Sequence, residues 1–364
     1  MVYVGIDQHK RHLTICTRDE QGDILLRRQV STQWEKIDRF LESLQDRSAG
    51  QGGYVAVVEV CGFNGWLVQR LEQYGCRQAY VIKAPDRVRV KTDRRGAAKL
   101  SELLWINRDR IAAGDQLVHI SVVCPPTEEE HYDRQLTHLR HRLGQAMTRA
   151  KNGIKGILRR HNAEQHCPTK GIFTKAGLGW VKTVELPEMD RLELDMRLAE
   201  YSLYAGQIRE ADARIHVRAE RIKSKVHRLR TLPKIGEYTA LALLAHIGSV
   251  ERFTHARSLS NYFGITPSCR NTGASDRPGS ITKAGHPLVR FLPAQMVLHA
   301  LRGNPGLRAW YRQVKRRRGS KIARVAVMRR LCESIWHMLT EQEDYRPVDT
   351  RAHHGTRKAG RSAA

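Results

Sequence analysis

Two long stretches in the middle of the chain repeat apolar residues at intervals of three and four. The first runs from Leu136 to Ile157, and the second continues the same spacing from Leu194 to Leu229. This spacing is typical of long amphipathic helices of the coiled-coil type. The segment between them, about 162–188, contains glycines and a proline and predicts a connector. A helical hairpin and a dimerising stalk both satisfy the pattern.

The residues before this helical region predict a layered α/β domain. Short apolar runs bounded by charged or glycine-rich turns predict five strands, and segments with helical spacing alternate with the later strands. The predicted strands cover 2–6, 13–16, 24–26, 54–58 and 79–82, and the predicted helices cover 33–47, 63–74 and 97–106. This order fits an RNase H-like sheet.

The composition changes again after residue 231. The run Leu232-Pro233-Lys234-Ile235-Gly236 precedes a short helical segment, and such a turn either forms a helix-hairpin-helix that offers N–H groups to phosphate or is a plain helix turn. A polar loop follows at 267–285, and helices are predicted at about 286–302 and 320–341. We therefore expect an α/β catalytic domain at 1–125, coiled-coil helices with their connector at 126–230, a mainly α domain at 231–345 and a basic disordered tail at 346–364.

The charge balance favours a nucleic-acid partner. The chain has 63 Lys and Arg against 37 Asp and Glu, a net charge of +26, which favours polyanions through counterion release. No apolar run reaches the roughly 18 residues that span a membrane, and the N-terminal segment with Asp7 does not resemble a signal peptide. Seven scattered cysteines without a CxxC pair argue against a disulfide framework and a structural zinc site. We expect a cytoplasmic, nucleoid-associated protein without a membrane partner.

Three acids stand at the ends of predicted elements. Asp7 ends the first strand, Glu59 ends the strand 54–58, and Asp93 follows the strand 79–82 just before a helix. Acids that converge above one edge of a sheet can bind Mg²⁺ or Mn²⁺ and promote attack at phosphorus. Each acid alone is more often an ordinary turn residue or helix cap. Their combination in a strongly basic chain predicts a metal site.

Two further segments can contact a phosphate. The loop that begins at Asn271 is rich in hydroxyls and glycines, so it can approach a phosphate closely and offer a nucleophilic hydroxyl, although alone it is an ordinary polar loop. The segment from Arg302 to Arg330 contains many cations and no acid. The predicted nucleic-acid contacts in these segments are Arg277, Lys283, Lys315, Arg316, Arg317, Arg318, Lys321 and Arg324.

Several motifs, taken together, resemble one family. GIDQHK near the start, VVEVCGFNGWL around Glu59 and KTDRRGAAKLSELL around Asp93 resemble the RuvC-like domain of the IS one-ten type (DEDD) insertion-sequence transposases. LPKIGEYTALALLAHIGSVERFTHARSLSNYFGITPS, GSITKAGH and RRRGSKIARVAVMRRL are similar to the C-terminal transposase domain of that family. The resemblance covers nearly the whole chain, and it places a coiled coil between the two domains.

The resemblance implies a site-specific DNA recombinase that moves its element through a Holliday-type junction. Its implied partners are donor and target DNA, a noncoding bridge RNA that pairs with both, and further copies of the chain in a dimer or tetramer. Asp7, Glu59 and Asp93 would hold Mg²⁺. A serine of the C-terminal domain, supplied by another protomer, would attack the phosphodiester and become linked to DNA before a 3′-hydroxyl rejoins the strands.

Two positions depart from the family pattern. The family has a fourth acid three residues after the third, where this chain has Gly96, and Glu102 is a candidate substitute. The family nucleophile is usually a serine before a glycine, where this chain has Thr272, with Ser268, Ser275 and Ser280 nearby. Three hypotheses follow: a Mg²⁺-dependent recombinase, a catalytically weakened nucleic-acid-binding member, and a RuvC-like structure-specific nuclease that uses water.

Overall fold

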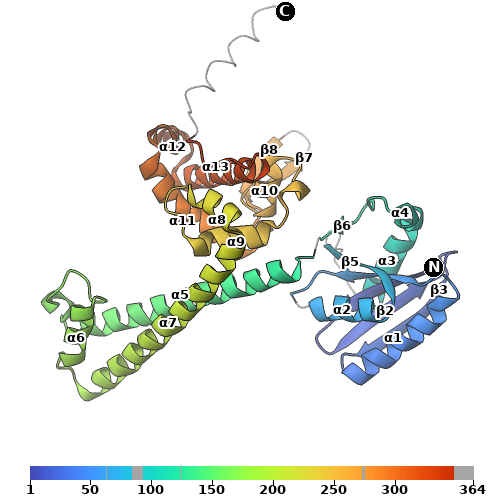
Figure 1. Cartoon of the computed structure of the whole chain (residues 1–364), viewed down its shortest axis with the longest axis horizontal. Coiled ribbons are helices and arrows are strands. Elements are labelled where there is room, and N and C mark those ends of the chain that lie inside the picture. Colours follow the sequence, from blue (N-terminus) through green and yellow to red (C-terminus); the bar gives the residue numbers. More distant parts are fainter. Residues whose placement is uncertain (63, 84–92, 124, 273–274, 348–364) are drawn as a thin grey trace, which may run out of the picture. The chain divides into compact units, whose positions relative to one another are not determined.

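A computed structural model describes residues 1–62, 64–83, 93–123, 125–272 and 275–347 (Figure 1). Contacts between residues divide the chain into two compact units, Met1–Pro125 and Pro126–Ala364. Within the described residues, no helix has the length and apolar character needed to cross a membrane.

The first unit is built on a mixed six-stranded sheet with the order β3-β2-β1-β4-β5-β6. The first three strands form an antiparallel meander, β4 and β5 run parallel to β1, and the short β6 is antiparallel to β5. The strands are β1 (Val2–Gln8), β2 (His12–Arg18), β3 (Ile24–Ser31), β4 (Tyr54–Glu59), β5 (Cys76–Lys83) and β6 (Ser121–Val122).

Helices cover both faces of this sheet. Val4 and Val58 point to one face, where they pack against α1 (Trp34–Ala49) and α2 (Gly65–Gln73). Side chains alternate along a strand, so Tyr3 and Val57 point to the other face, where they pack against α3 (Asp93–Ile106), which is followed by α4 (Arg108–Ala113).

The packing of α3 on β1 depends on a glycine. A Cβ atom on Gly5 would lie 2.3 Å from the carbonyl oxygen of Ala97 and 2.3 Å from the backbone nitrogen of Ser101. Any side chain at position 5 would therefore push α3 away from the strand. This close approach holds α3 directly over the strand that carries Asp7.

The second unit begins with a helical hairpin (Figure 1). The helices α5 (Glu128–Arg160) and α7 (Glu188–Arg221) pack along each other, and α6 (Lys175–Thr183) and the short η1 (Glu164–His166) lie in the connector. Thr127 and Glu130 form a capping box at the start of α5. Within one chain, the two long helices form the helical hairpin that the apolar spacing allows.

The remainder of the second unit is mostly helical and encloses one apolar core. That core includes Leu229, Leu243, Phe263, Val327 and Ile335, all fully buried. The elements are α8 (Lys223–Arg230), α9 (Glu237–Ile247), η2 (Val250–Arg252), α10 (Ala256–Tyr262), β7 (Pro267–Thr272), β8 (Ser275–Ile281), α11 (Pro287–Gly303), α12 (Pro305–Arg318) and α13 (Ser320–Thr340).

Three of the differences from the sequence-based expectation have a clear physical reason. The second long helix ends at Ile222, whose backbone leaves the helical region (φ −119°, ψ 37°), so α8 is separate. The segment expected as a loop contains the β7–β8 hairpin, since an antiparallel ladder satisfies the backbone without apolar alternation. The missed helix α12 has a recognisable start, because Asn304 caps it and Pro305 occupies its first turn. Of the expected tail, 348–364 lie outside the described residues.

Candidate functional site

Asp7 and Glu59 occupy equivalent positions on neighbouring parallel strands. Ile6 of β1 is in register with Val58 of β4, so the next residue on each strand is an acid. By the alternation of side chains, both acids belong to the face of the sheet that α3 covers. Neighbouring strands are about 5 Å apart. Asp7 is only 8% exposed and Glu59 is half-buried, so this pair of carboxylates lies at a partly sheltered edge of the sheet.

The helix α3 begins over the same edge. Asp93 is its first residue, and its side chain lies outside the described set. Gly96, almost one turn later, lies against Asp7, because a Cβ atom on Gly96 would be 2.7 Å from Asp7 Oδ2. Position 96, where the family has its fourth acid, therefore faces the first acid directly. Glu102 is exposed and lies six residues further, roughly 9 Å along the helix, so it does not replace an acid at 96.

Polar residues that sequence reasoning missed hold the two strand ends together. The Asn64 Nδ2 group donates to Gln8 Oε1 (2.9 Å) and to the Glu59 carbonyl oxygen (3.0 Å). The Asn64 Oδ1 atom accepts from the Cys61 N–H (2.5 Å). His9 Nε2 lies 3.7 Å from Asp7 Oδ2. Their position at or shortly after the ends of β1 and β4, within GIDQHK and VCGFNGWL, is the sequence signal that would have found them.

Thr272 is the last residue of β7, opposite Ser275 at the start of β8. It therefore stands at the tip of the hairpin, although its side chain and those of Ser275 and Arg277 lie outside the described set. Arg277 is on β8, in register with Arg270. The other two serines lie toward the base of the hairpin, where Ser268 Oγ donates to the Ser280 carbonyl oxygen (3.0 Å).

The loop that carries Lys283 is held in a fixed shape. The Lys283 backbone has a positive φ of 56°, and its N–H donates to the Gly264 carbonyl oxygen (3.0 Å). Gly264 leaves no room for a side chain, since a Cβ there would be 2.4 Å from the Ala284 nitrogen. The Arg290 guanidinium donates to the carbonyl oxygens of Lys283 (3.0 Å) and Gly285. The Lys283 side chain is exposed on this fixed loop.

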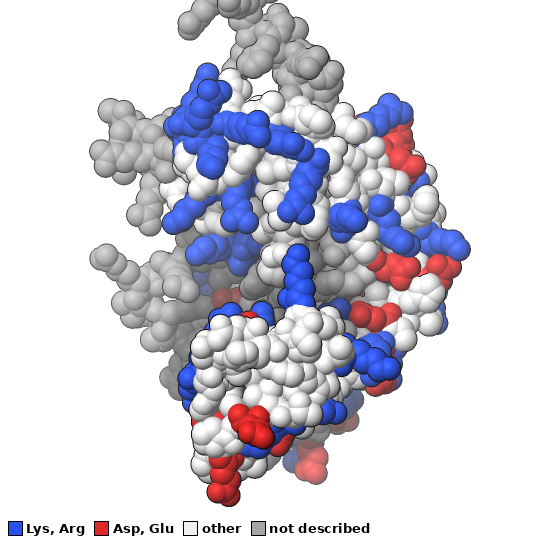
Figure 2. Space-filling view, turned by 90° about the vertical axis from the view of Figure 1, so that its left-hand side faces the viewer, with Lys and Arg blue, Asp and Glu red and all other residues white. Residues whose placement is uncertain are grey.

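The remaining predicted cations are exposed around the junction of α12 and α13. Figure 2 shows Lys and Arg side chains gathered in its upper part, where few acidic side chains interrupt them. We call the following residues the α12–α13 basic surface: Lys315, Arg316, Arg317, Arg318, Lys321 and Arg324. Such a surface can neutralise phosphates without selecting a sequence.

Not every cation of this region belongs to that surface. Arg308 donates to the carbonyl oxygens of Leu301 and Arg302, both at 2.8 Å. The Arg330 guanidinium lies 3.8 Å from the centre of the Trp310 ring, and burial lowers its pKa. These two arginines therefore stabilise the packing of α11, α12 and α13.

Two family models match the chain. A model of DEDD transposases of the IS110 type matches residues 4–163, and the "Transposase IS116/IS110/IS902 family" model matches residues 226–312. This chain belongs to the IS110-type transposases. The mixed sheet agrees with the RNase H-like fold that the DEDD domain implies, and domains of that type use divalent metal ions.

Curated relatives of this transposase extend the likeness to almost the whole chain. The transposase for insertion sequence element IS1111A of Coxiella burnetii is 24% identical over 359 residues, which cover 94% of this chain and 91% of that protein. A probable family 20 transposase of Pseudomonas aeruginosa is 22% identical and covers 94% and 98%. The transposase for IS1328 of Yersinia enterocolitica is 22% identical and covers 93% and 96%.

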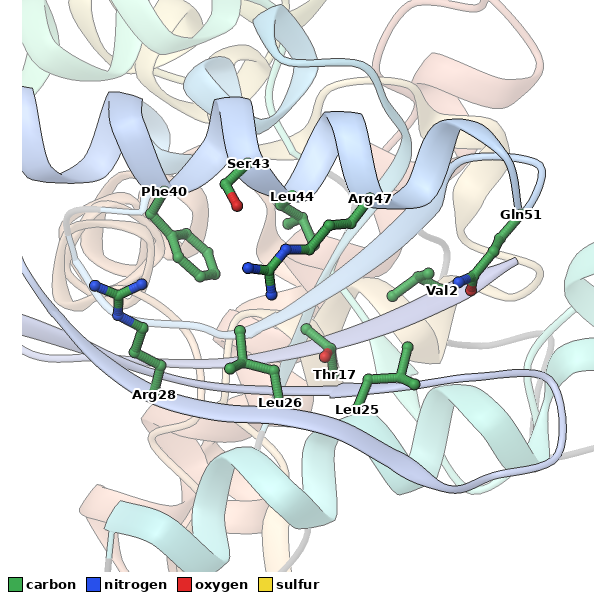
Figure 3. Close-up of a pocket in the computed structure, with 10 residues that line it drawn as sticks. All are labelled: Val2, Thr17, Leu25, Leu26, Arg28, Phe40, Ser43, Leu44, Arg47 and Gln51. Atoms are coloured by element: carbon green, nitrogen blue, oxygen red, sulfur yellow. The ribbon is translucent and has the colours of Figure 1, made fainter.

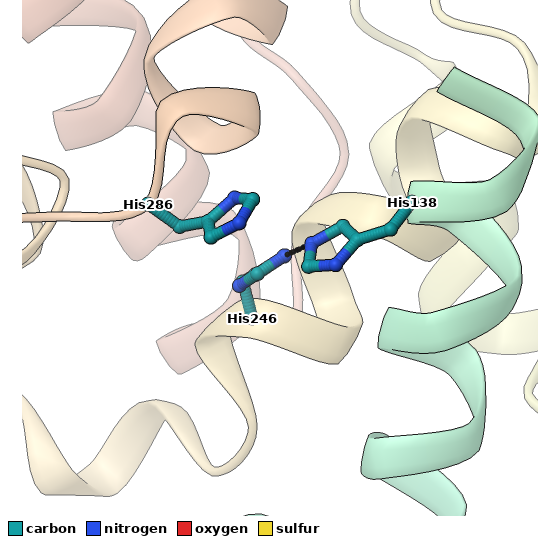
Figure 4. A group of neighbouring side chains, drawn as sticks. All are labelled: His138, His246 and His286. Atoms are coloured by element: carbon teal, nitrogen blue, oxygen red, sulfur yellow. Dashed lines mark hydrogen bonds between the residues drawn. The ribbon is translucent and has the colours of Figure 1, made fainter. Parts of the chain in front are cut away.

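The transposase also contains a cluster of three histidines that no sequence spacing indicates (Figure 4). His138 of α5, His246 of α9 and His286 at the start of α11 have ring nitrogens within 4.8 Å of one another. The Nε2 atoms of His138 and His246 are 3.0 Å apart. Burial, neighbouring histidines and nearby arginines lower the pKa of His138 to about 4 and that of His246 to about 3. The cluster is therefore neutral at physiological pH.

The surroundings of this cluster oppose a bound cation. Arg134 lowers the pKa of all three histidines. Arg252 also lowers the pKa of His246, and Arg290 lowers that of His286. The Nδ1 atom of His286 accepts a hydrogen bond from the Leu288 N–H (3.2 Å), so its lone pair caps α11. The arrangement is that of a neutral polar contact between α5, α9 and α11.

A groove of about 320 Å³ lies between β3 and α1 (Figure 3). Its apolar lining includes Val2, Leu26, Phe40 and Leu44, which belong to the α1 side of the sheet. The acids face the α3 side of that sheet, so this groove is separate from the acidic site of the transposase.

Proposed function

We propose that this transposase exchanges DNA strands through a covalent protein–DNA intermediate. In this proposal Asp7, Glu59 and Asp93 hold Mg²⁺ or Mn²⁺, and Thr272 supplies the attacking hydroxyl. The observation that carries the proposal is the placement of Asp7 and Glu59 at the same level of adjacent strands, beneath the helix that begins at Asp93.

The residues present fit a hard divalent cation. Two carboxylates at one sheltered sheet edge, with a third acid position at the start of α3, form the oxygen-rich donor set that Mg²⁺ prefers. When bound, the ion would stabilise negative charge on the attacked phosphate. Asn64 joins Gln8 to the backbone of Glu59 and so keeps the two acid-bearing strand ends in register.

In each of the two proposed steps, one bond to phosphorus forms while another breaks. The Thr272 hydroxyl loses its proton to solvent and its oxygen attacks phosphorus, so an Oγ–P bond forms while the P–O3′ bond breaks and the 3′-oxygen leaves as a hydroxyl. A 3′-hydroxyl of the other strand then attacks the same phosphorus and releases the Thr272 hydroxyl. The place of Thr272 at a hairpin tip supports this role, because a tip can approach a phosphate.

A denaturing gel tests this proposal. The purified full chain is incubated with Mg²⁺, the DNA ends of its element and the flanking noncoding RNA. We expect a slow DNA band that protease collapses, and we expect Thr272→Ala to remove it while Ser268→Ala, the matched control, retains it. An adduct that persists in Thr272→Ala contradicts the assignment and moves the nucleophile to Ser275. Free cut DNA without an adduct identifies a RuvC-like nuclease.

We further propose that a noncoding bridge RNA selects the DNA sites. The α12–α13 basic surface supports this part, because clustered Lys and Arg bind any phosphate backbone and leave sequence selection to base pairing. Omitting the RNA from the same reaction should abolish site-specific joining while leaving DNA binding. Equal joining at the same sites without RNA would contradict guidance.

One observation favours a second candidate, a catalytically weakened nucleic-acid-binding protein. Gly96 leaves the position that faces Asp7 without a carboxylate. This candidate function predicts that the native chain binds nucleic acid tightly but does not exchange DNA strands. The double variant Gly96→Asp with Thr272→Ser should then gain strand exchange, and the absence of any gain would count against it.

A further inference from the structure

Trp34, the first residue of α1, is an exposed tryptophan that two other side chains hold in place. It is 53% exposed, although tryptophan is on average a highly buried residue. The centre of its ring lies 5.4 Å from that of Trp66 in α2, and the two rings meet at an angle of 83°. The guanidinium carbon of Arg70 lies 4.8 Å from the centre of the Trp34 ring. An indole that contacts two side chains and still exposes half of its surface can accept a further flat group.

The two partners of Trp34 are themselves anchored. Trp66 packs against the apolar core on the α1 side of the sheet. The Arg70 guanidinium donates to Gln73 Oε1 (3.2 Å), and its Nε atom lies 3.6 Å from Asp38 Oδ1. Because the indole is held from two directions, it has little side-chain entropy left to lose when a ligand stacks on it. We call Trp34, Trp66 and Arg70 together the tryptophan platform.

The tryptophan platform lies at the same edge of the sheet as Asp7 and Glu59. Strands β1 and β3 run in the same direction, since each is antiparallel to β2, so both end at this edge. Trp34 follows the end of β3, and Trp66 follows the end of β4. One strand separates β3 from β1, which places their ends roughly 10 Å apart. The acids face the α3 side and the platform lies on the α1 side, so a nucleic-acid strand that reaches both passes over this edge.

Two exposed cations stand at this edge beside the platform. Lys10 and Arg11 belong to the turn between β1 and β2, and both side chains are exposed. Thr32 fixes this turn next to the start of α1, because its hydroxyl donates to the Lys10 carbonyl oxygen (3.1 Å) and its N–H donates to that of Arg11 (3.0 Å). Lys and Arg bind phosphates without selecting a sequence. One edge of the sheet therefore presents acids, cations for a phosphate backbone and an aromatic surface.

We propose that the tryptophan platform stacks an unpaired base of the DNA strand whose phosphate is attacked at Asp7 and Glu59. This inference rests on the proposed strand exchange, because a strand that changes partners must leave its own duplex. Aromatic rings and arginines bind unpaired bases by stacking, and this contact accepts every base. The roughly 10 Å between the strand ends corresponds to about three nucleotides of a stacked strand. A base held there would keep the strand unpaired and fix its phosphate at the acids.

Oligomer binding without a metal ion tests the stacking. The full chain is titrated in EDTA against a fluorescent thymidine oligomer of about 12 nucleotides and against an oligomer of equal charge that lacks bases. We expect Trp34→Leu to weaken binding of the thymidine oligomer at least about 10-fold, since one stacked base is lost, and to leave binding of the base-free oligomer unchanged. Trp34→Phe, which keeps an aromatic ring, should retain most of the affinity. Native affinity in Trp34→Leu, or an equal loss for both oligomers, would overturn the proposal.

Trp105 of α3 provides a matched control. The guanidinium carbon of Arg108 also lies 4.8 Å from the centre of its ring. The Nε1 group of Trp105 donates to the Glu20 carbonyl oxygen (2.9 Å), in the turn between β2 and β3 at the opposite edge of the sheet. Trp105→Leu should therefore leave the binding of both oligomers unchanged, and circular dichroism checks that the variants fold. A loss in Trp105→Leu as large as that in Trp34→Leu would contradict a site at the platform.

Photocrosslinking locates the base and identifies the strand. A DNA oligomer that carries 5-iodouracil, and its RNA equivalent, are each irradiated with the full chain in EDTA, and mass spectrometry identifies the crosslinked peptides. We expect the DNA oligomer to crosslink at Trp34. Crosslinks confined to the second unit, or a Trp34 crosslink with the RNA oligomer alone, would overturn the proposal. Neither measurement requires Mg²⁺ or an adduct at Thr272, so the stacking can fail while strand exchange succeeds, and strand exchange can fail while the stacking is observed.

Discussion

Gly96 lies so close to Asp7 that a Cβ atom at position 96 would be 2.7 Å from the Asp7 carboxylate oxygen. The position where the DEDD pattern has its fourth acid thus faces the first acid, and the space between them is too small for a side chain at position 96 unless Asp7 moves. An acid at 96 requires Asp7 to turn aside, and it would then add a ligand at the same edge of the sheet.

We expect Gly96→Asp to increase Mg²⁺ affinity roughly 10-fold, because a further carboxylate joins the acids already at this edge. Isothermal titration with Mg²⁺ measures it. Gly96→Asn has nearly the same size without the charge, so it should bind no better than the native chain. If both variants bind more weakly, then volume beside Asp7 outweighs charge and position 96 is not a ligand position in this chain.

Replacing either Asp7 or Glu59 should remove DNA strand cleavage. We expect Asp7→Asn and Glu59→Gln each to lower Mg²⁺-dependent strand cleavage at least about 100-fold, since each removes one hard anionic ligand. Timed cleavage assays with labelled DNA measure it, and a thermal melt confirms folding. Asp46→Asn, at an exposed acid of α1, is the matched control. Native rates in Asp7→Asn would exclude that residue from the site.

The α12–α13 basic surface should control the salt dependence of DNA binding. The double variant Arg316→Gln with Arg317→Gln should lower the slope of log affinity against log salt by roughly 2, because each lost phosphate contact removes about 0.9. Arg308→Gln removes a cation that is engaged with two backbone carbonyls. That control should lower the melting temperature but keep the slope, and equal slopes in all three proteins would place the DNA elsewhere.

The three-histidine cluster should make the second unit sensitive to acid. In the folded chain the pKa of His246 falls from its ordinary 6.5 to about 3, mainly because of burial. The unfolded chain therefore binds a proton first as the pH falls below about 6.5, and stability is lost from there toward about pH 3. By about pH 5 the loss from His246 reaches up to about 2 kcal/mol.

Thermal melts across this pH range measure the effect. His246→Gln should flatten the dependence of melting temperature on pH, whereas His227→Gln, at an exposed histidine of α8, should leave it unchanged. A native chain that melts at the same temperature at neutral pH and at about pH 5 would show that the cluster does not resist protonation.

The layered first unit was predictable because its strands are apolar runs closed by turns, and an acid directly after such a run must lie at a sheet edge. The sequence could not give the register that places Asp7 level with Glu59, because that depends on which strands pair. It also could not show that position 96 faces Asp7, since this follows from the close packing of α3 over Gly5.

In the second unit, the features that could not be predicted from the sequence were missed for different reasons. The long helices follow from their apolar spacing, but the break at Ile222 does not interrupt that spacing. The β7–β8 ribbon is polar on both strands, so it lacks the alternation that identifies a strand. The histidine cluster joins residues 108 positions apart, His138 and His246, through tertiary packing alone.

The helix α7 is apolar on two sides, since Leu194 and Ile215 are buried while Met196 and Leu203 are exposed, and this restricts how its gene can change. Removing or adding a single residue within α7 turns everything beyond that point by about 100°, which misaligns the inner and outer apolar sides together. Point substitutions leave both sides in place, but a change of length is tolerated only when it adds or removes nearly whole turns, such as seven, eleven or eighteen residues, and α5 must change with it for the two arms of the hairpin to stay matched. Length polymorphism among descendants of this chain should therefore fall in the connector rather than in the arms.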